Sequence, residues 1–197
     1  ERLNGPTLDQ VLVEHPTGVP WPLLREIAVP LLEALQYSHT AGALHGDIKP
    51  SNIILTEDGL RLFDYGLGQP LHDLLPGLPR LARHRFAAWT PRYAAPELLD
   101  GHELTATADV FAVGCVLHEL AAGEHPFRRL SAKQAKALAL DAALKCPPGL
   151  PAACWKALRQ ALRFEPTARP DSVTPLLEAF RQPQPSRWKR WLGLHHG

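Results

Sequence analysis

The sequence predicts a mainly helical domain that carries one small β-hairpin beside a polar loop. Residues 22–39 place apolar side chains every three or four positions, and residues 105–123 are apolar on nearly all sides, which indicates two helices. Between them, two short apolar runs flank an Asp-Gly pair, which is typical of a hairpin. A chain of 197 residues has the length of one domain with a sizeable core.

The composition excludes several classes of protein. Lys and Arg number 21 against 20 for Asp and Glu, so net charge gives no indication of a nucleic-acid partner. The three cysteines show no metal-ligand spacing, and an odd count argues against a disulfide framework. We therefore expect a reduced, cytoplasmic setting. No apolar run approaches the length of a membrane span.

The first half of the chain should contain two helices in succession. A turn-rich start is followed by Leu8, Val11 and Leu12 at helical spacing, which predicts a short first helix. The second helix should stop at Gly42, and Pro30 inside it predicts a kink or a break. This helix delivers the chain to the polar loop.

The polar loop concentrates the chemistry of the sequence. Asp47, Lys49 and Asn52 place an acid, a cation and an amide within six residues, and Asp64 follows twelve residues after Asn52. Asp47 could accept a proton from an attacking hydroxyl, and Lys49 could neutralise charge on a transferring phosphoryl group. Carboxylate and carbonyl oxygens are the ligands that Mg²⁺ prefers, so we expect Asn52 and Asp64 to hold the metal.

The predicted hairpin brings these two ligands together. Residues 53–55 and 60–63 are its apolar runs, so Asn52 precedes one strand and Asp64 follows the other. Antiparallel pairing should therefore place both at the same end.

Residues 66–90 read as a long loop, which in a compact domain is usually functional or disordered. Thr105 or Thr107 is the expected N-cap of the apolar helix, and Asp109 within that helix needs a polar partner. Further helical segments are expected near residues 132–143, 152–162 and 172–180.

Taken together, His-x-Asp-x-Lys-Pro-x-Asn at 45–52 and Asp-Tyr-Gly at 64–66 resemble the catalytic loop and metal-binding turn of eukaryotic-type, bacterial-like Ser/Thr protein kinases. Further marks of that family follow in order: Thr-Pro-Arg-Tyr-Ala-Ala-Pro-Glu at 90–97, Asp-Val-Phe-Ala-Val-Gly at 109–114, and Glu-Pro-Thr-Ala-Arg-Pro at 165–170. The resemblance covers the larger, C-terminal lobe of a kinase and implies ATP and Mg²⁺ as cofactors and a protein as substrate.

The resemblance also implies roles for single residues. Thr90 would join Asp47 and Lys49 in placing the substrate hydroxyl. Ile54 would form the floor beneath the adenine, and the backbone of Glu1 and Leu3 would face its edge. Two structural contacts are implied as well, one from Asp109 to the backbone near His45 and one between Arg169 and Glu97.

Two departures from the family bear on regulation. Gly46 stands where regulated kinases carry an Arg that pairs with a phosphorylated residue, and residues 67–89 contain no Ser, Thr or Tyr. Both indicate that activity, if present, does not depend on phosphorylation of that segment.

Nothing in the chain matches the Gly-rich loop or the strand Lys of the smaller kinase lobe. We therefore expect residues 1–181 to be the C-lobe of a longer kinase, with 1–12 as a hinge-like start and an N-lobe or upstream domain as partner. Alone, this segment should be inactive. One alternative is a pseudokinase-like binding scaffold. Another is a small-molecule phosphotransferase, against which Lys49 and the Ala-Pro-Glu run argue.

The tail, residues 182–197, should be flexible. Basic and aromatic residues alternate in its Arg-Trp-Lys-Arg-Trp-Leu run at 187–192, as in segments that touch anionic membranes. It predicts membrane proximity for an otherwise cytoplasmic chain.

Overall fold

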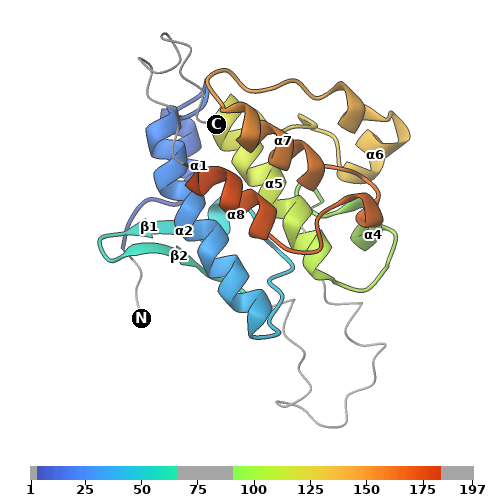
Figure 1. Cartoon of the computed structure of the whole chain (residues 1–197), viewed down its shortest axis with the longest axis horizontal. Helices are drawn as coiled ribbons and strands as arrows, with labels where there is room; N and C mark the ends of the chain where they lie inside the picture. The colour runs from blue at the N-terminus through green and yellow to red at the C-terminus, as the bar shows by residue number, and fades with distance from the viewer. Residues whose placement is uncertain (1–3, 66–90, 183–197) are drawn as a thin grey trace, which may run out of the picture.

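The computed structural model describes residues 4–65 and 91–182, drawn as coloured ribbon in Figure 1. The α-helices are α1 (Leu8–Glu14), α2 (Trp21–Thr40), α4 (Pro96–Leu99), α5 (Ala106–Ala122), α6 (Ala132–Ala137), α7 (Ala152–Ala161) and α8 (Thr174–Arg181). The strands are β1 (Ile53–Thr56) and β2 (Gly59–Leu62), and short 3₁₀ turns are η1 (Pro50–Asn52), η2 (Leu140–Ala143) and η3 (Pro166–Ala168). The prediction of a mainly helical domain with one hairpin is confirmed.

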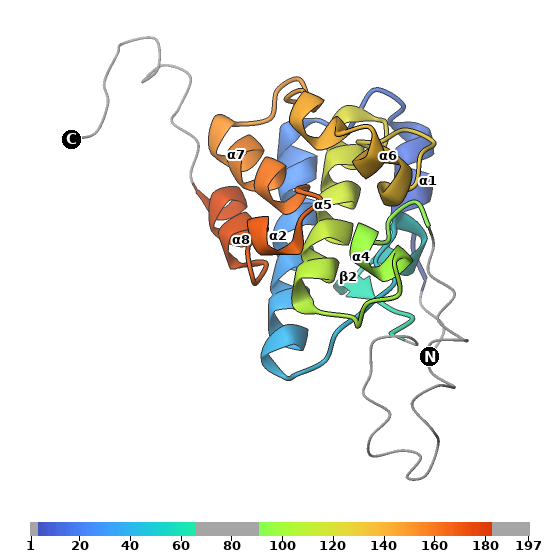
Figure 2. The same ribbon diagram turned by 90° about the vertical axis from the view of Figure 1, so that its right-hand side faces the viewer.

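Helices α2 and α5 form the centre of the domain. In Figure 2 they run side by side, with α7 and α8 on one flank and α4 and α6 on the other. Every residue of α5 from Ala108 to Ala121 is buried, as its apolar sequence predicts. Gly114 lets α7 approach closely, because a Cβ there would lie 3.2 Å from the Cβ of Ala161.

Helix α2 buries the face that its sequence pattern predicts, including Leu24, Leu31 and Leu35. The helix continues from Trp21 to Thr40 through Pro30, so the prediction of a break there is wrong. Tertiary packing of this apolar face outweighs the one backbone donor that proline lacks. The chain then turns at Gly42, which has a φ of +77°.

The hairpin pairs Ile53 with Leu62 and Thr56 with Gly59. Its two-residue turn is therefore Glu57-Asp58, and the glycine of the Asp-Gly pair opens β2 with a φ of +112°. The start of the described chain lies against β1, where the amide of Leu55 donates to the carbonyl of Pro6 at 2.9 Å.

Several boundaries differ from the sequence-based expectation. The helix expected over 132–143 ends at Ala137, and η2 follows after Ala139, whose left-handed φ of 49° interrupts the helix. Thr105 is the N-cap residue of α5, although its side chain makes no capping bond. Helix α4 was not predicted, because four residues are too few to show a periodic pattern. Across the parts of the chain that the structure describes, no helix has the length and apolar character to span a membrane.

Candidate active site

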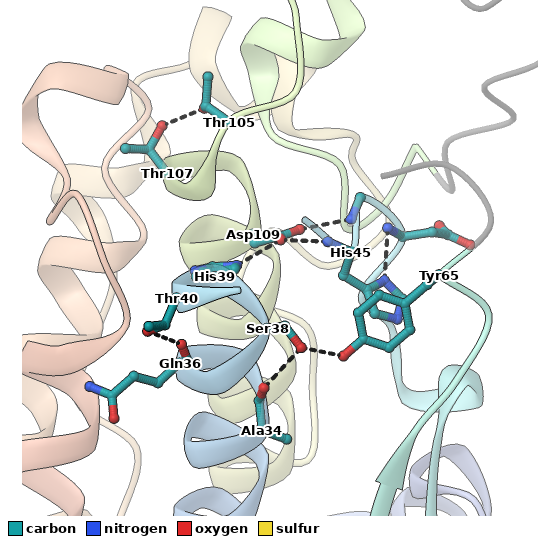
Figure 3. Close-up of polar contacts among 12 residues, drawn as sticks. Ala34, Gln36, Ser38, His39, Thr40, His45, Tyr65, Thr105, Thr107 and Asp109 are labelled. Carbon is teal, nitrogen blue, oxygen red and sulfur yellow. Dashed lines mark hydrogen bonds and ion pairs between the residues drawn. The ribbon is translucent and has the colours of Figure 1, made fainter. Parts of the chain in front are cut away.

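A carboxylate of the central helix α5 binds the backbone of the polar loop. Asp109, 1 % exposed on α5, accepts hydrogen bonds from the backbone amides of His45 at 2.8 Å and Gly46 at 2.9 Å. The ring of His39 on α2 lies 2.9 Å from the same carboxylate (Figure 3). Three partners offset the cost of burying the charge. The expected contact between Asp109 and the backbone near His45 is confirmed.

The contact with His39 was not predicted. His39 falls on the apolar, inward side of the α2 pattern, at the end of the helix nearest the loop. This position could have indicated that its ring contacts a buried group. Its ring ties α2 to α5 through Asp109, so that two helices and the loop share one carboxylate.

His45 connects the loop to the chain beyond the hairpin. Its Nδ1 accepts from the amide of Asp47 at 3.2 Å, which leaves Nε2 to donate to the carbonyl of Phe63 at 3.0 Å. Burial lowers the pKa of His45, so the neutral ring that this bonding requires is favoured. The ring also packs on Tyr65, with centroids 4.5 Å apart, and the Tyr65 hydroxyl bonds Ser38 at 2.8 Å (Figure 3).

Three of the expected site residues form one cluster. Nζ of Lys49 lies 2.6 Å from Oδ2 of Asp47, and Nδ2 of Asn52 donates to the backbone carbonyl of Asp47 at 2.9 Å. A longer contact of 3.3 Å joins the same Nδ2 to Oδ2 of Asp47. The side chains of Asp47 and Lys49 are 10 % and 22 % exposed, so each keeps a small part of its surface in contact with solvent. The structure thus brings acid, cation and amide together.

The hairpin carries the fourth residue to the same end. The amide of Phe63 donates to the carbonyl of Asn52 at 3.1 Å, which extends the pairing by one step beyond Ile53 and Leu62. Asp64 follows directly and is exposed. Its φ of +65° is uncommon for a residue with a side chain. Such a conformation costs about 1–3 kcal/mol and is often found where a side chain has to be aimed for function.

Ile54, the expected adenine floor, is 6 % exposed and forms an isolated bridge with Thr7. The chain before α1 therefore covers part of β1. Gly5 permits this approach, because a Cβ there would collide with the carbonyl oxygen of Leu55.

The expected pair between Glu97 and Arg169 is present. The Arg169 guanidinium bonds both carboxylate oxygens of Glu97, at 2.6 and 2.8 Å, and its remaining hydrogens reach the carbonyls of Arg163, Thr107 and Phe164. All five of its N–H donors are thereby used. Arg169 also lies over the ring of Phe111, with the guanidinium carbon 4.8 Å from the ring centroid.

A second buried carboxylate was not identified from the sequence. Glu119, 7 % exposed on α5, accepts from the Tyr93 hydroxyl at 2.6 Å and from Arg92 at 2.8 Å. Burial and this carboxylate together raise the pKa of Tyr93. The rule that applies to Asp109, that an acid in an apolar helix needs partners, could have indicated Glu119. Through Arg92 and Tyr93, Glu119 fixes the described segment that follows Thr90.

Some of the expected site residues lie outside the described residues. These are Glu1, Leu3, Thr90, the remainder of the loop over 66–90 and the tail from 183 onward. Within residues 4–65 and 91–182, no three or more His, Cys, Asp or Glu side chains gather as a metal site. The expected metal pair consists of an amide and a carboxylate, and Mg²⁺ bound to substrate phosphates commonly uses only one or two protein carboxylates.

Comparison with known proteins gives a consistent result. A family model described as "Protein kinase domain" matches residues 1–181. The chain is 34% identical over 179 residues to "Serine/threonine-protein kinase PkaA" of Streptomyces coelicolor, which covers 86% of this chain and 31% of that protein. It is 36% identical over 129 residues to "Probable serine/threonine-protein kinase PknB" of Corynebacterium glutamicum, covering 64% and 19%. The chain thus spans less than a third of the length of these relatives.

Proposed function

The chain belongs to the protein kinase family, among serine/threonine kinases, and from this premise we propose that it carries the catalytic loop for ATP-dependent phosphoryl transfer to protein Ser or Thr hydroxyls. The observation that carries the proposal is the cluster of Asp47, Lys49 and Asn52 on a loop whose backbone is bonded to Asp109. An acid, a cation and an amide oxygen held at fixed distances suit transfer by positioning and charge neutralisation.

In this proposal Asp47 orients the acceptor hydroxyl and takes its proton, while Lys49 neutralises charge on the transferring group. Thr90 would place the same hydroxyl. The contacts of Lys49 and Asn52 with Oδ2 of Asp47 support this assignment, because they hold the carboxylate in one orientation.

Asn52 and Asp64 are the residues that would hold Mg²⁺, and their chemistry fits the ion. The amide nitrogen of Asn52 is engaged with Asp47, which leaves the carbonyl oxygen for a cation. Among described residues, neither this oxygen nor the Asp64 carboxylate accepts a hydrogen bond. Bound Mg²⁺ would supply charge neutralisation at the ATP phosphates.

We also propose that the chain supplies the C-terminal lobe and that an N-terminal lobe covers the nucleotide from the other side. The described residues contain helices and a single two-stranded hairpin, which supports this division. Ile54 on that hairpin would then contact the adenine from below, and the backbone of Glu1 and Leu3 would meet its edge.

Nucleotide binding tests the site directly. The 1–197 chain should bind a fluorescent ATP analogue in the presence of Mg²⁺, and Asp64→Ala should weaken binding at least roughly tenfold through loss of a metal ligand. Asp58→Ala is the matched control, because Asp58 is an exposed acid in the turn at the opposite end of the same hairpin. Equal binding by both variants would refute the assignment of Asp64.

Phosphoryl transfer by the 1–197 chain alone should be undetectable, because half of the nucleotide site would be missing. Incorporation of γ-phosphate from labelled ATP, with the Asp47→Asn variant as blank, measures this. Robust autophosphorylation that disappears in the variant would contradict the proposed division into lobes.

A further inference from the structure

A groove lies beside the segment that carries Arg92 and Tyr93. It has a volume of about 810 Å³ and is bounded by Arg92, the loop 124–130 and the turn η2 with Leu144. This volume is within the range of sites that hold ligands. The groove lies outside the cluster of Asp47, Lys49 and Asn52, and none of the roles proposed above uses it.

The floor of the groove is apolar and fixed in place. Phe127 is 1 % exposed and packs against the rings of Phe111 and Phe164, while Leu130 and Leu140 are half-buried beside it. A floor of this kind favours a bulky apolar side chain of a ligand.

His125, in the wall of the groove, adds no charge. Its ring meets Tyr93 edge-on at 5.1 Å, and burial lowers its pKa to about 3. It is therefore neutral at physiological pH.

The rim carries positive charge. Arg128 and Arg129 are both exposed, and the side chain of Arg92 is 45 % exposed. Arg92 forms an ion pair with Glu119. Arg128 and Glu124 are 3.7 Å apart and both are exposed, so their ion pair neutralises the charge of Arg128 only weakly. Arg129 has no ion pair with any residue in the described ranges.

The groove is connected to the proposed active site through Tyr93. Asp47 and Tyr93 line the same small cavity on one side, and the ring of Tyr93 contacts His125 on the other. Glu119 holds Tyr93 and Arg92 in place through two hydrogen bonds. A polypeptide seated in the groove would therefore contact His125, whose ring packs on the tyrosine that also borders the Asp47 cavity.

We propose that this groove docks a segment of the protein substrate that combines acidic residues with a bulky apolar side chain. The role as a substrate site rests on the proposed kinase function, whereas the binding chemistry rests on the arginine rim and the apolar floor. The chain's own remaining segments do not fit by charge. Residues 66–90 contain three arginines and one aspartate, and residues 183–197 contain three basic residues and no acid. Neither segment is acidic, so the charge of the rim favours an acidic segment of the protein substrate as the occupant.

Binding of a peptide without any phosphate acceptor tests the groove separately from catalysis. The probe is a short fluorescein-labelled peptide that alternates Glu and Leu and lacks Ser, Thr and Tyr, measured by fluorescence anisotropy with the 1–197 chain. A peptide with Lys in place of Glu is the charge control. We expect saturable binding of the acidic peptide, weakened by added salt, and much weaker binding of the basic one.

Two matched variants locate the binding. Arg129→Glu should weaken binding of the acidic peptide roughly tenfold, because it reverses a charge at the rim. Arg159→Glu makes the same change at an exposed position on α7 and should alter binding less than about twofold. Circular dichroism of both variants verifies the fold.

Equal binding of the two peptides, or equal effects of the two variants, would overturn the proposal, as would the absence of any acidic-peptide binding by a folded chain. Mg²⁺-dependent nucleotide binding by the longest natural form of the protein separates the two hypotheses. Peptide binding by the 1–197 chain without nucleotide binding by that longer form would refute the proposed function and leave the groove, and the reverse result would refute the groove alone.

Discussion

Among single residues, the buried charged and polar groups determine the geometry of the site. Asp109 and Glu119 lie on the same central helix, and each accepts bonds from a segment that borders the proposed site. Removing a partner from such a carboxylate leaves a buried group unsatisfied, which costs more than the bond itself contributes.

Asp109→Asn should lower the free energy of unfolding by about 2–4 kcal/mol, because an amide presents one NH₂ group where both carboxylate oxygens now accept hydrogen bonds. Urea denaturation followed by circular dichroism measures this change. The control is Glu103→Gln, an exposed acid just before α5, which should have no measurable effect. A stability loss below the experimental error in Asp109→Asn would contradict the bracing role.

His125 predicts a pH dependence of stability. Burial lowers its pKa from 6.5 to about 3, so between these values the unfolded chain binds a proton that the folded chain does not. The free energy of unfolding should therefore fall as pH decreases below 6.5, with a contribution from His125 of up to about 1.4 kcal/mol per pH unit. His125→Asn should reduce that slope, and His102→Asn, at an exposed position, should not. Identical slopes in both variants would show that His125 is not buried in its neutral form.

At the scale of the elements, contacts between residues far apart in the sequence hold helices and loops together. Arg169, on the turn between η3 and α8, joins α4 through Glu97 and the start of α5 through the carbonyl of Thr107. The end of α5 is joined to the loop between α1 and α2 by the close approach of Gly123 to Pro16.

The pair of Arg169 and Glu97 should be strongly coupled. Arg169→Lys removes the fork that reaches five acceptors and should cost about 3–5 kcal/mol of stability. A double-mutant cycle with Glu97→Gln should show that the two losses are not additive. Lys136→Ala, which breaks an exposed pair with Glu165, is the control and should change stability little. Additive losses in the cycle would contradict direct coupling.

Gly42 and Gly123 form a matched test of close packing between elements. Their φ angles are +77° and +75°, but a Cβ at Gly42 meets nothing within 4 Å, whereas one at Gly123 collides with the carbonyl of Pro16. Gly42→Ala should cost about 1 kcal/mol for the backbone conformation alone. Gly123→Ala should cost roughly 1–3 kcal/mol more because of the collision. Equal decreases in the free energy of unfolding, measured by urea denaturation, would show that the loop at Pro16 moves aside at no cost.

At the scale of the whole molecule, periodic sequence patterns predicted which elements form and which of their faces are buried. The amphipathic face of α2, the uniformly buried α5 and the presence of the hairpin follow from the spacing of apolar residues. The proximity of Asn52 to the end of β2 follows from the antiparallel pairing of the two strands. Asp109 and Arg169 were expected from the family resemblance, and their contacts were confirmed.

Other features depend on contacts between distant segments. Helix α2 continues through Pro30 because of its packing against other elements, which the local sequence does not specify. Likewise, no local spacing predicts the contact of His39 with Asp109 or the hydrogen bond of Tyr93 with Glu119. The end of α6 at Ala137 is set by the backbone of Ala139 rather than by a helix-breaking residue. The positive rim of the groove likewise arises from assembly, since Arg92 and Arg129 are distant in sequence.

The central claim is that Asp47 serves phosphoryl transfer to protein hydroxyls. The most direct measurement is the rate of γ-phosphate transfer from ATP to Ser and Thr of an acceptor protein, catalysed by the longest natural form of the protein. Wild type should transfer phosphate, and Asp47→Asn should lower the rate by roughly 10²–10⁴-fold while Mg²⁺-dependent nucleotide binding is retained. An unchanged rate in Asp47→Asn, or nucleotide binding without any transfer by the wild type, would contradict the account.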